Sequence, residues 1–355
     1  MQLSRIAALS ALTWLPAVSG LNIMLGNDDG FGSANLREVY RLLKTAGHNT
    51  LMVAPSNFQS GKGGTSVYAD SGTLYGPSEY DLVPAGSPSL GTDPADSMIW
   101  YYNGTPAACA VVGLDWVVPK YTNWTHVDLV IAGPNFGNNL GNYLYTLSGT
   151  NGYTYTSVGK GVPGIAFSAG NSEQRSYKWI NETTPTGFPD PATLSAQLVV
   201  GLVEKLARAT PNGSALMPPG YGLSVNFPKL TSLQDDSCIA PPFIQTRMTG
   251  GAEWDTIVYN ETTKTFKYGD TYPAAGNRCI NGNCLLPGES DVLDNGCQSS
   301  VSVFTVDYDA PVGKEQDDLR SRLFPLVEYF PNSTTKGYGK RETKGKFKQS
   351  SRWTL

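Results

Sequence analysis

Histidine, cysteine and charge are all scarce in this chain, and each scarcity narrows the chemistry that it can perform. Its 355 residues include two histidines and five cysteines, and charged residues make up 16% of the total. Both histidines, His48 and His126, stand outside every glycine-rich or acidic motif, so we assign them to structure. The net charge of −4 is mild and argues against binding to a nucleic-acid duplex. The sequence contains no internal repeat.

A long apolar run occurs at the N-terminus alone, so no membrane-spanning segment is expected elsewhere. Arg5 precedes a mostly apolar stretch at 6–18, which is too short to span a bilayer, and Ala17-Val18-Ser19 offers small residues for cleavage. Residues 1–20 are therefore predicted to be a signal peptide, and the product to be soluble and secreted or vacuolar. Glycosylation sequons agree with that route, at Asn123, Asn181, Asn212, Asn260 and Asn332.

The cysteines divide into one isolated residue and one group. Cys109 lies in an apolar helical stretch and is predicted to be a buried free thiol. The other four fall near the C-terminus and allow three pairings. We favour Cys279–Cys284, which closes a tight loop, together with Cys238–Cys297. A zinc site is the rival, but no histidine lies nearby and the export signal favours disulfides.

Strand-like and helical patterns alternate through most of the chain, which is typical of an α/β fold with a largely parallel sheet. After the first strand, apolar residues from Leu36 to Leu43 follow helical spacing. Residues 70–96 are predicted to be an irregular surface segment, and residues 232–298 an elaboration that carries disulfides. The expected strands are 21–26, 49–54, 127–132, 164–168, 223–227 and 301–306, and the expected helices are 36–47, 106–116 and 192–208.

One domain is predicted over 21–330, followed by a basic tail over 331–355. From Thr334 onward the tail holds seven Lys and Arg residues against Glu342 alone. It has few large apolar residues, so we expect it to be disordered and solvated.

The stretch Leu21–Gly30 ends an apolar run in two adjacent carboxylates, Asp28 and Asp29, followed by a glycine. Neighbouring carboxylates repel each other unless a cation lies between them. Ligands of open α/β sheets bind at the carboxyl ends of strands. This stretch alone supports two interpretations equally, a divalent-metal site and a solvated Asp-Asp-Gly turn.

Several further motifs follow in a fixed order, and together they resemble the SurE family of survival protein SurE-like phosphatases and nucleotidases. No single motif is specific, but their order is. The resemblance covers about residues 21–309. Its motifs are Asn27-Asp28-Asp29-Gly30, Ala54-Pro55, Gln59-Ser60-Gly61, Gly104-Thr105-Pro106, the loop 133–141, Ser148-Gly149-Thr150, Val225-Asn226-Phe227-Pro228, Thr246-Arg247 and Glu289-Ser290-Asp291.

The resemblance implies a Rossmann-like three-layer α/β/α sandwich and a metal-dependent phosphatase of the secreted, fungal-like kind. Its substrates are expected to be phosphate monoesters such as nucleoside monophosphates, and its assembly a homodimer or tetramer. The family's metal ligands map onto Asp28, Asp29, Ser60 and Asn135, and its phosphate-binding residues onto Asn139, Ser148, Gly149 and Thr150. The two aspartates are also the expected catalytic residues.

The chemistry of these residues agrees with that mapping. Carboxylate, hydroxyl and amide oxygens suit Mg²⁺ or Mn²⁺, and Ca²⁺ as well, better than Zn²⁺. Hydroxyls and N–H groups beside glycines form an anion cradle.

The chain departs from the family pattern at Gly133-Pro134, around Asn142-Tyr143, at Leu147 and at Asn151-Gly152-Tyr153-Thr154. These departures leave the proposed ligands intact but put substrate preference in doubt. A haloacid dehalogenase-type phosphatase needs Asp-X-Asp, whereas here the two aspartates are adjacent. A P-loop at Gly61–Thr65 fails because Gly-X4-Gly-Lys-Ser/Thr is absent. From another class, the chain could be an inactive secreted glycoprotein that binds a ligand at the same site.

Overall fold

The computed structural model describes residues 20–170, 174–181, 183–248, 257–268 and 284–323. Two compact units divide the chain, Met1–Tyr308 and Asp309–Leu355, and the second contains one helix within the described residues, α8 (Lys314–Leu323). No helix in the described part is long and apolar enough to span a membrane. The predicted signal peptide, except for Gly20, and the basic tail lie outside the described residues and stay predictions.

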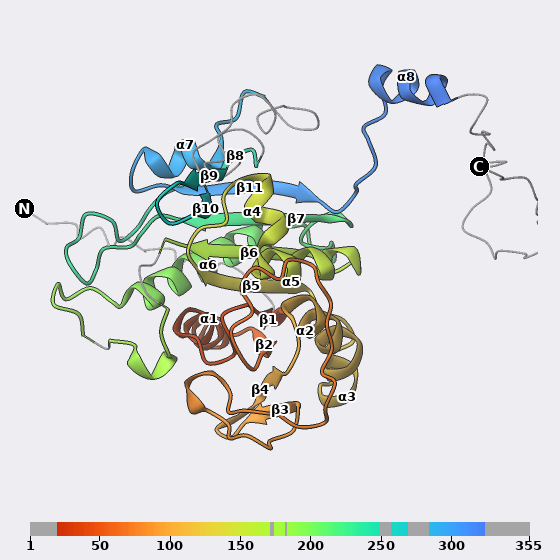
Figure 1. Ribbon diagram of the computed structural model, residues 1–355. Helices are drawn as coiled ribbons and strands as arrows, with labels where there is room; N and C mark the ends of the chain where they lie inside the picture. Colours follow the sequence, from red (N-terminus) through yellow and green to blue (C-terminus); the bar gives the residue numbers. More distant parts are fainter. Residues whose placement is uncertain (1–19, 171–173, 182, 249–256, 269–283, 324–355) are drawn as a thin grey trace, which may run out of the picture. The chain divides into compact units, whose positions relative to one another are not determined.

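A nine-stranded sheet forms the centre of the first unit, in the order β3-β4-β2-β1-β5-β6-β7-β11-β8 (Figure 1). Its pairs are parallel except for β3 with β4 and β11 with β7. Its strands are β1 (Asn22–Gly26), β2 (Asn49–Pro55), β3 (Leu90–Asp93), β4 (Asp96–Tyr102), β5 (Leu129–Phe136), β6 (Gly164–Ala169), β7 (Tyr221–Phe227), β8 (Phe243–Thr246) and β11 (Ser299–Thr305). A separate antiparallel hairpin pairs β9 (Ile257–Asn260) with β10 (Thr265–Tyr268).

Helices cover both faces of the sheet, because alternate strand residues point to opposite faces and both sets are apolar. On one face, Ile23 and Leu25 pack in the core with residues of α1 and α6; on the other, Met24 packs with residues of α2 and α5. The fold is therefore a three-layer α/β/α sandwich (Figure 1). The remaining helices are α1 (Ala34–Thr45), α2 (Pro106–Val112), α3 (Val118–Tyr121), α4 (Gly141–Leu147), α5 (Gly149–Gly159), α6 (Pro191–Ala209) and α7 (Glu289–Asp294).

All six expected strands and three expected helices are present, with small shifts at their ends. One expectation was wrong. The segment 70–96 is not wholly irregular, because β3 falls inside it and β4 begins at its end, and together they form one edge of the sheet. Ser148 caps α5, and Gly149 and Thr150 begin that helix.

One predicted disulfide is present, Cys238–Cys297, and Cys109 is a buried free cysteine as expected. Cys238 lies between β7 and β8, and Cys297 lies between α7 and β11, so the bridge ties the C-terminal elaboration to the sheet. Cys279 lies outside the described residues, so the Cys279–Cys284 bridge stays a prediction.

Candidate active site at the carboxyl ends of three strands

The predicted metal ligands lie at or after the carboxyl ends of three neighbouring parallel strands. β1 lies between β2 and β5, so the chain order reverses on either side of it, which is where open α/β sheets bind ligands. Asp28 and Asp29 follow β1, Ser60 follows β2, and Asn135 lies at the end of β5. Gly30 has a φ of +91°, so the chain turns directly after the aspartates in a conformation that favours glycine.

Asp28 is almost fully buried, at 1% exposure, and is held from the start of α5. The Thr150 hydroxyl donates to Asp28 Oδ1 at 2.5 Å, and the Asp28 carbonyl accepts the Gln59 N–H at 2.7 Å. Burial raises the pKa of Asp28, and hydrogen bonds from Thr150 and Gly149 oppose the rise. A Cβ on Gly149 would lie 2.8 Å from Asp28 Cβ, so glycine is needed for this close approach. The carboxylate is thus fixed in orientation before any ligand binds.

Asp29 is equally buried, at 1% exposure, but has fewer hydrogen-bond donors around it. The Phe136 N–H donates to Asp29 Oδ2 at 3.2 Å, and this contact joins the ends of β1 and β5. Burial and the charge of Asp28 raise the pKa of Asp29 well above its usual value, and the charge of Glu79 adds to the rise. No Lys, Arg or His within the described ranges forms an ion pair with either aspartate.

This donor set fits a divalent cation. Two adjacent buried carboxylates without a cationic partner are costly unless a positive ion neutralises them. The Asn135 amide donates its Nδ2 hydrogens to the carbonyls of Phe136 (3.2 Å) and Gly137 (2.8 Å), so its Oδ1 is the atom left for a cation. Ser60 contributes an exposed hydroxyl. The described residues contain no cluster of three or more His, Cys, Asp or Glu that could hold a metal, so any shell here includes hydroxyl or amide oxygens.

The expected phosphate-binding residues are near the aspartates, but most of their hydrogen-bonding groups are already engaged. The Thr150 hydroxyl donates to Asp28, and the Ser148 hydroxyl accepts the Asn151 N–H at 3.1 Å. Asn139 binds within the protein, because its amide donates to Ser168 Oγ at 2.8 Å and its N–H donates to Asn226 Oδ1 at 2.8 Å. These residues therefore make most of their hydrogen bonds within the protein, and few of their donors are left to bind a phosphate.

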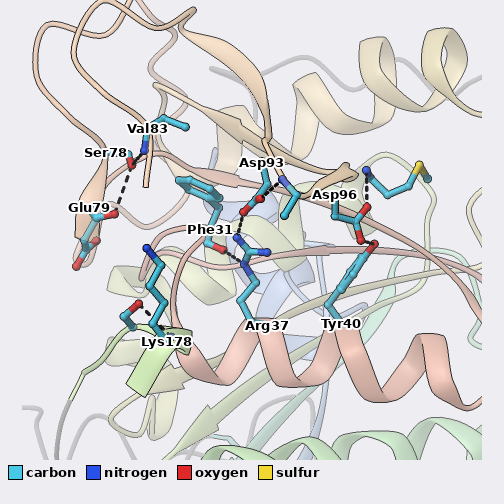
Figure 2. A network of polar contacts seen from close by, with 12 residues as sticks. Phe31, Arg37, Tyr40, Ser78, Glu79, Val83, Asp93, Asp96 and Lys178 are labelled. Atoms are coloured by element: carbon cyan, nitrogen blue, oxygen red, sulfur yellow. Dashed lines mark hydrogen bonds and ion pairs between the residues drawn. The ribbon is translucent and has the colours of Figure 1, made fainter. Parts of the chain in front are cut away.

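Glu79 and Gln174 were not predicted, yet both reach the site. The Gln174 amide donates to the Asp29 carbonyl and to Glu79 Oε1, both at 3.3 Å. Figure 2 shows Glu79 on a tight turn in which the Ser78 hydroxyl binds the Val83 N–H. Glu79 lies inside the segment that we expected to be irregular, where no periodic pattern marks it.

Arg37 on α1 stabilises the loop that follows the aspartates. Its Nε donates to the Phe31 carbonyl at 2.7 Å, and its guanidinium pairs with Asp93, as Figure 2 shows. The ring of Tyr177 stacks on the guanidinium, 4.3 Å from ring centroid to Cζ. Arg37 is thus committed to structure and is not free to bind a substrate.

Comparison with known proteins identifies the group to which this arrangement belongs. Residues 23–248 match the model of the family described as survival protein SurE. The chain belongs to the SurE family. An acid phosphatase from Yarrowia lipolytica is 43% identical over 324 residues, which cover 90% of this chain and 88% of that protein. The 5'-nucleotidase SurE of a Synechococcus species is 31% identical over 189 residues, 53% of this chain and 60% of that protein.

A solved SurE structure shares the fold. The SurE protein from Aquifex aeolicus has a TM-score of 0.54 and 21% sequence identity, over 86% of this chain and 99% of that one. The predicted family and the Rossmann-like sandwich are both confirmed. The matched residues 23–248 include every residue that we placed at the SurE-like site.

Proposed function

We propose that this SurE-family chain hydrolyses phosphate monoesters, with nucleoside monophosphates among its substrates, and that it requires a divalent metal. One observation carries the proposal: two adjacent carboxylates, Asp28 and Asp29, are buried after β1, and no Lys, Arg or His in the described residues forms an ion pair with them. The names of the relatives, acid phosphatase and 5'-nucleotidase SurE, support the same reaction class.

The residues have separate roles in this proposal. Asp28, Asp29, Ser60 and Asn135 hold Mg²⁺ or Mn²⁺, and the same oxygen donors suit Ca²⁺. When bound, the ion is a Lewis acid that neutralises charge on phosphoryl oxygens. Thr150 and the first turn of α5 keep Asp28 oriented, and the Phe136 N–H keeps Asp29 oriented. Either carboxylate acts as the base for the attacking water or as the nucleophile.

Turnover assays test this function. p-Nitrophenyl phosphate and nucleoside monophosphates are offered with Mg²⁺ or Mn²⁺, with EDTA and the Asp29→Ala variant as controls. We expect hydrolysis by the wild-type protein that both controls abolish. Full activity of Asp29→Ala would contradict the metal site. Folded, metal-loaded protein that hydrolyses no monoester would favour the alternative, a secreted glycoprotein that binds a ligand without turnover.

Secretion and glycosylation are further proposals. Attachment of a glycan requires an exposed asparagine. Four of the predicted glycosylation sites lie in the described residues and are exposed: Asn123, Asn181, Asn212 and Asn260. The Cys238–Cys297 bridge is typical of the same oxidising route. Expression in a eukaryotic host should give protein in the medium whose mass falls on treatment with an N-glycosidase. We also propose a homodimer or tetramer, which light scattering tests.

A further inference from the structure

Among the described residues that we have placed at the site so far, no Lys or Arg faces the substrate, so the proposed metal ion is the one positive charge assigned to it. A phosphate monoester brings negative charge to a place where Asp28 and Asp29 are already buried. Catalysis of phosphoryl transfer rests largely on electrostatic stabilisation of the phosphoryl oxygens. Arg37, which binds the Phe31 carbonyl, pairs with Asp93, and Arg175, which follows Gln174 in the sequence, pairs with Asp190.

The first turn of α5 supplies little in place of a cation. Its Gly149 and Thr150 groups are directed to Asp28, the Asn151 N–H is bound by Ser148 Oγ, and the Gly152 N–H donates to the Ser148 carbonyl at 2.8 Å. These donors already have acceptors, so another group has to meet the phosphoryl oxygens.

Four segments carry the metal and phosphate ligands that the sequence predicts: 27–33, 56–66, 133–141 and 147–152. Lys62 is the single Lys or Arg in all four. It is exposed and forms no ion pair with any residue that the structure describes. Its position in the sequence is two residues after the expected metal ligand Ser60.

The fold brings the backbone of Lys62 next to the phosphate-binding turn. The N–H of the following residue, Gly63, donates to the Leu147 carbonyl at 2.9 Å, and Ser148 comes directly after Leu147. Gly63 and Gly152 also touch: a Cβ on Gly152 would lie 1.9 Å from the Gly63 carbonyl oxygen. The loop at 60–64 is therefore held on both sides, by the hydrogen bond from the Gln59 N–H to the Asp28 carbonyl and by that from the Gly63 N–H to the Leu147 carbonyl. Lys62 lies between these two contacts in the sequence.

We propose that Lys62 is a catalytic residue whose ammonium group binds the phosphoryl oxygens of the monoester, an inference that rests on the proposed phosphatase function. The lysine keeps its proton and donates hydrogen bonds to the non-bridging oxygens. Water adds to phosphorus and gives a proton to Asp28 or Asp29, the bond from phosphorus to the ester oxygen breaks, and the ester oxygen takes up a proton from solvent and leaves as the alcohol. A lysine on a flexible stem can follow the oxygens as charge redistributes. This assigns a purpose to the Gly61–Thr65 loop, which is not a P-loop.

Two measurements on the full-length, metal-loaded protein test the assignment. The first is kcat/KM for p-nitrophenyl phosphate, and the second is the binding of orthovanadate, followed by calorimetry. The variants are Lys62→Ala and Lys62→Arg, with Lys205→Ala as the control, because Lys205 is an exposed lysine on α6, outside the site segments. Lys62→Ala should lower kcat/KM on the order of tenfold to a hundredfold and weaken orthovanadate binding. Lys62→Arg should retain most of both, and Lys205→Ala should match the wild type.

The affinity for Mn²⁺ separates a charge effect from damage to the loop that carries Ser60. Removal of a positive charge near a cation site leaves Mn²⁺ binding unchanged or makes it tighter, whereas a disordered loop weakens it. Weaker orthovanadate binding with undiminished Mn²⁺ binding supports the assignment. A kcat/KM within twofold of the wild type, or a joint loss of Mn²⁺ and orthovanadate binding, overturns it. Absence of turnover in the wild type counts against the phosphatase function, while orthovanadate binding still tests Lys62.

Discussion

Glu289 is a buried carboxyl group that joins the C-terminal elaboration to the loop carrying Asn135. It is 1% exposed, and its Oε2 accepts the N–H of Gly141 at 2.7 Å. Gly141 begins α4, directly after the 133–140 loop. Burial raises the pKa of Glu289 from 4.5 to about 7, although the Gly141 hydrogen bond opposes the rise. We predict that Glu289→Gln makes stability less sensitive to pH.

The size and sign of that effect follow from the pKa. One pKa unit corresponds to about 1.4 kcal/mol, so the ionised form of Glu289 lowers the free energy of unfolding by about 3 kcal/mol. This loss of stability is absent below the pKa of the unfolded-state carboxyl group, grows as the pH rises from 4.5 to about 7, and is constant above about pH 7. Glutamine has no charge and can still accept the Gly141 N–H. Relative to the wild type, Glu289→Gln should therefore gain about 2–3 kcal/mol between about pH 5 and about pH 8.

Urea unfolding at both pH values measures this gain. Glu261→Gln is the matched control, because Glu261 is an exposed carboxylate in the turn between β9 and β10. The control should keep the same difference from the wild type, within about 0.5 kcal/mol, at both pH values. A Glu289→Gln difference that does not change with pH would refute the account of a buried, destabilised carboxylate.

Three further substitutions address the site and its support. Gly149→Ala places a Cβ against Asp28 and should destabilise the protein by about 1–3 kcal/mol and weaken Mn²⁺ binding, as unfolding and calorimetric titrations would show. Thr150→Val removes the hydroxyl donor to Asp28, so Mn²⁺ binding should need a higher pH than in the wild type. Thr150→Ser keeps a hydroxyl and should bind Mn²⁺ as the wild type does. If Thr150→Val bound Mn²⁺ with the pH dependence of the wild type, the role of this hydrogen bond would be contradicted. Cys238→Ser removes a disulfide between cysteines 59 positions apart and should lower the free energy of unfolding by about 4 kcal/mol by the loop-entropy relation. Urea unfolding of the variant and of the unreduced wild type measures this difference.

The sequence reveals most of the sheet, because fully apolar runs bounded by Gly and Pro are a strong local signal. β1, β2 and β5 are found in this way, and with them the sites of Asp28, Ser60 and Asn135. The short edge strand β3 is harder to find, since it lies in a segment rich in Gly, Pro and Ser and takes its register from pairing with its neighbour β4. Tertiary pairing, and not local propensity, decides its conformation.

The sequence predicts the site residues that belong to a motif, and it predicts less well the contacts that packing creates. The ordered motifs name Asp28 and Asp29, but they do not show that both are buried or that no Lys, Arg or His in the described residues pairs with them. The motifs name Ser148 and Thr150, but the sequence does not show that α5 begins there or that the Thr150 hydroxyl donates to Asp28. Glu79 reaches the site through a turn in which Tyr80 has a φ of +61°, a conformation unusual for a residue with a side chain, and no spacing rule predicts it.

Direct titration of Mn²⁺ into the metal-free protein tests the central claim, that the Asp28–Asp29 pair is a divalent-cation site. Calorimetry in two buffers of different ionisation enthalpy reports both affinity and proton release. We predict saturable binding to the wild type with release of protons at acidic pH, because the pKa of Asp29 is raised and binding requires the ionised form. Asp29→Asn, which keeps the shape of the side chain, should bind on the order of a hundredfold more weakly. Asp81→Asn, at an exposed aspartate, serves as the control. Undiminished Mn²⁺ binding by a folded Asp29→Asn protein would contradict the claim.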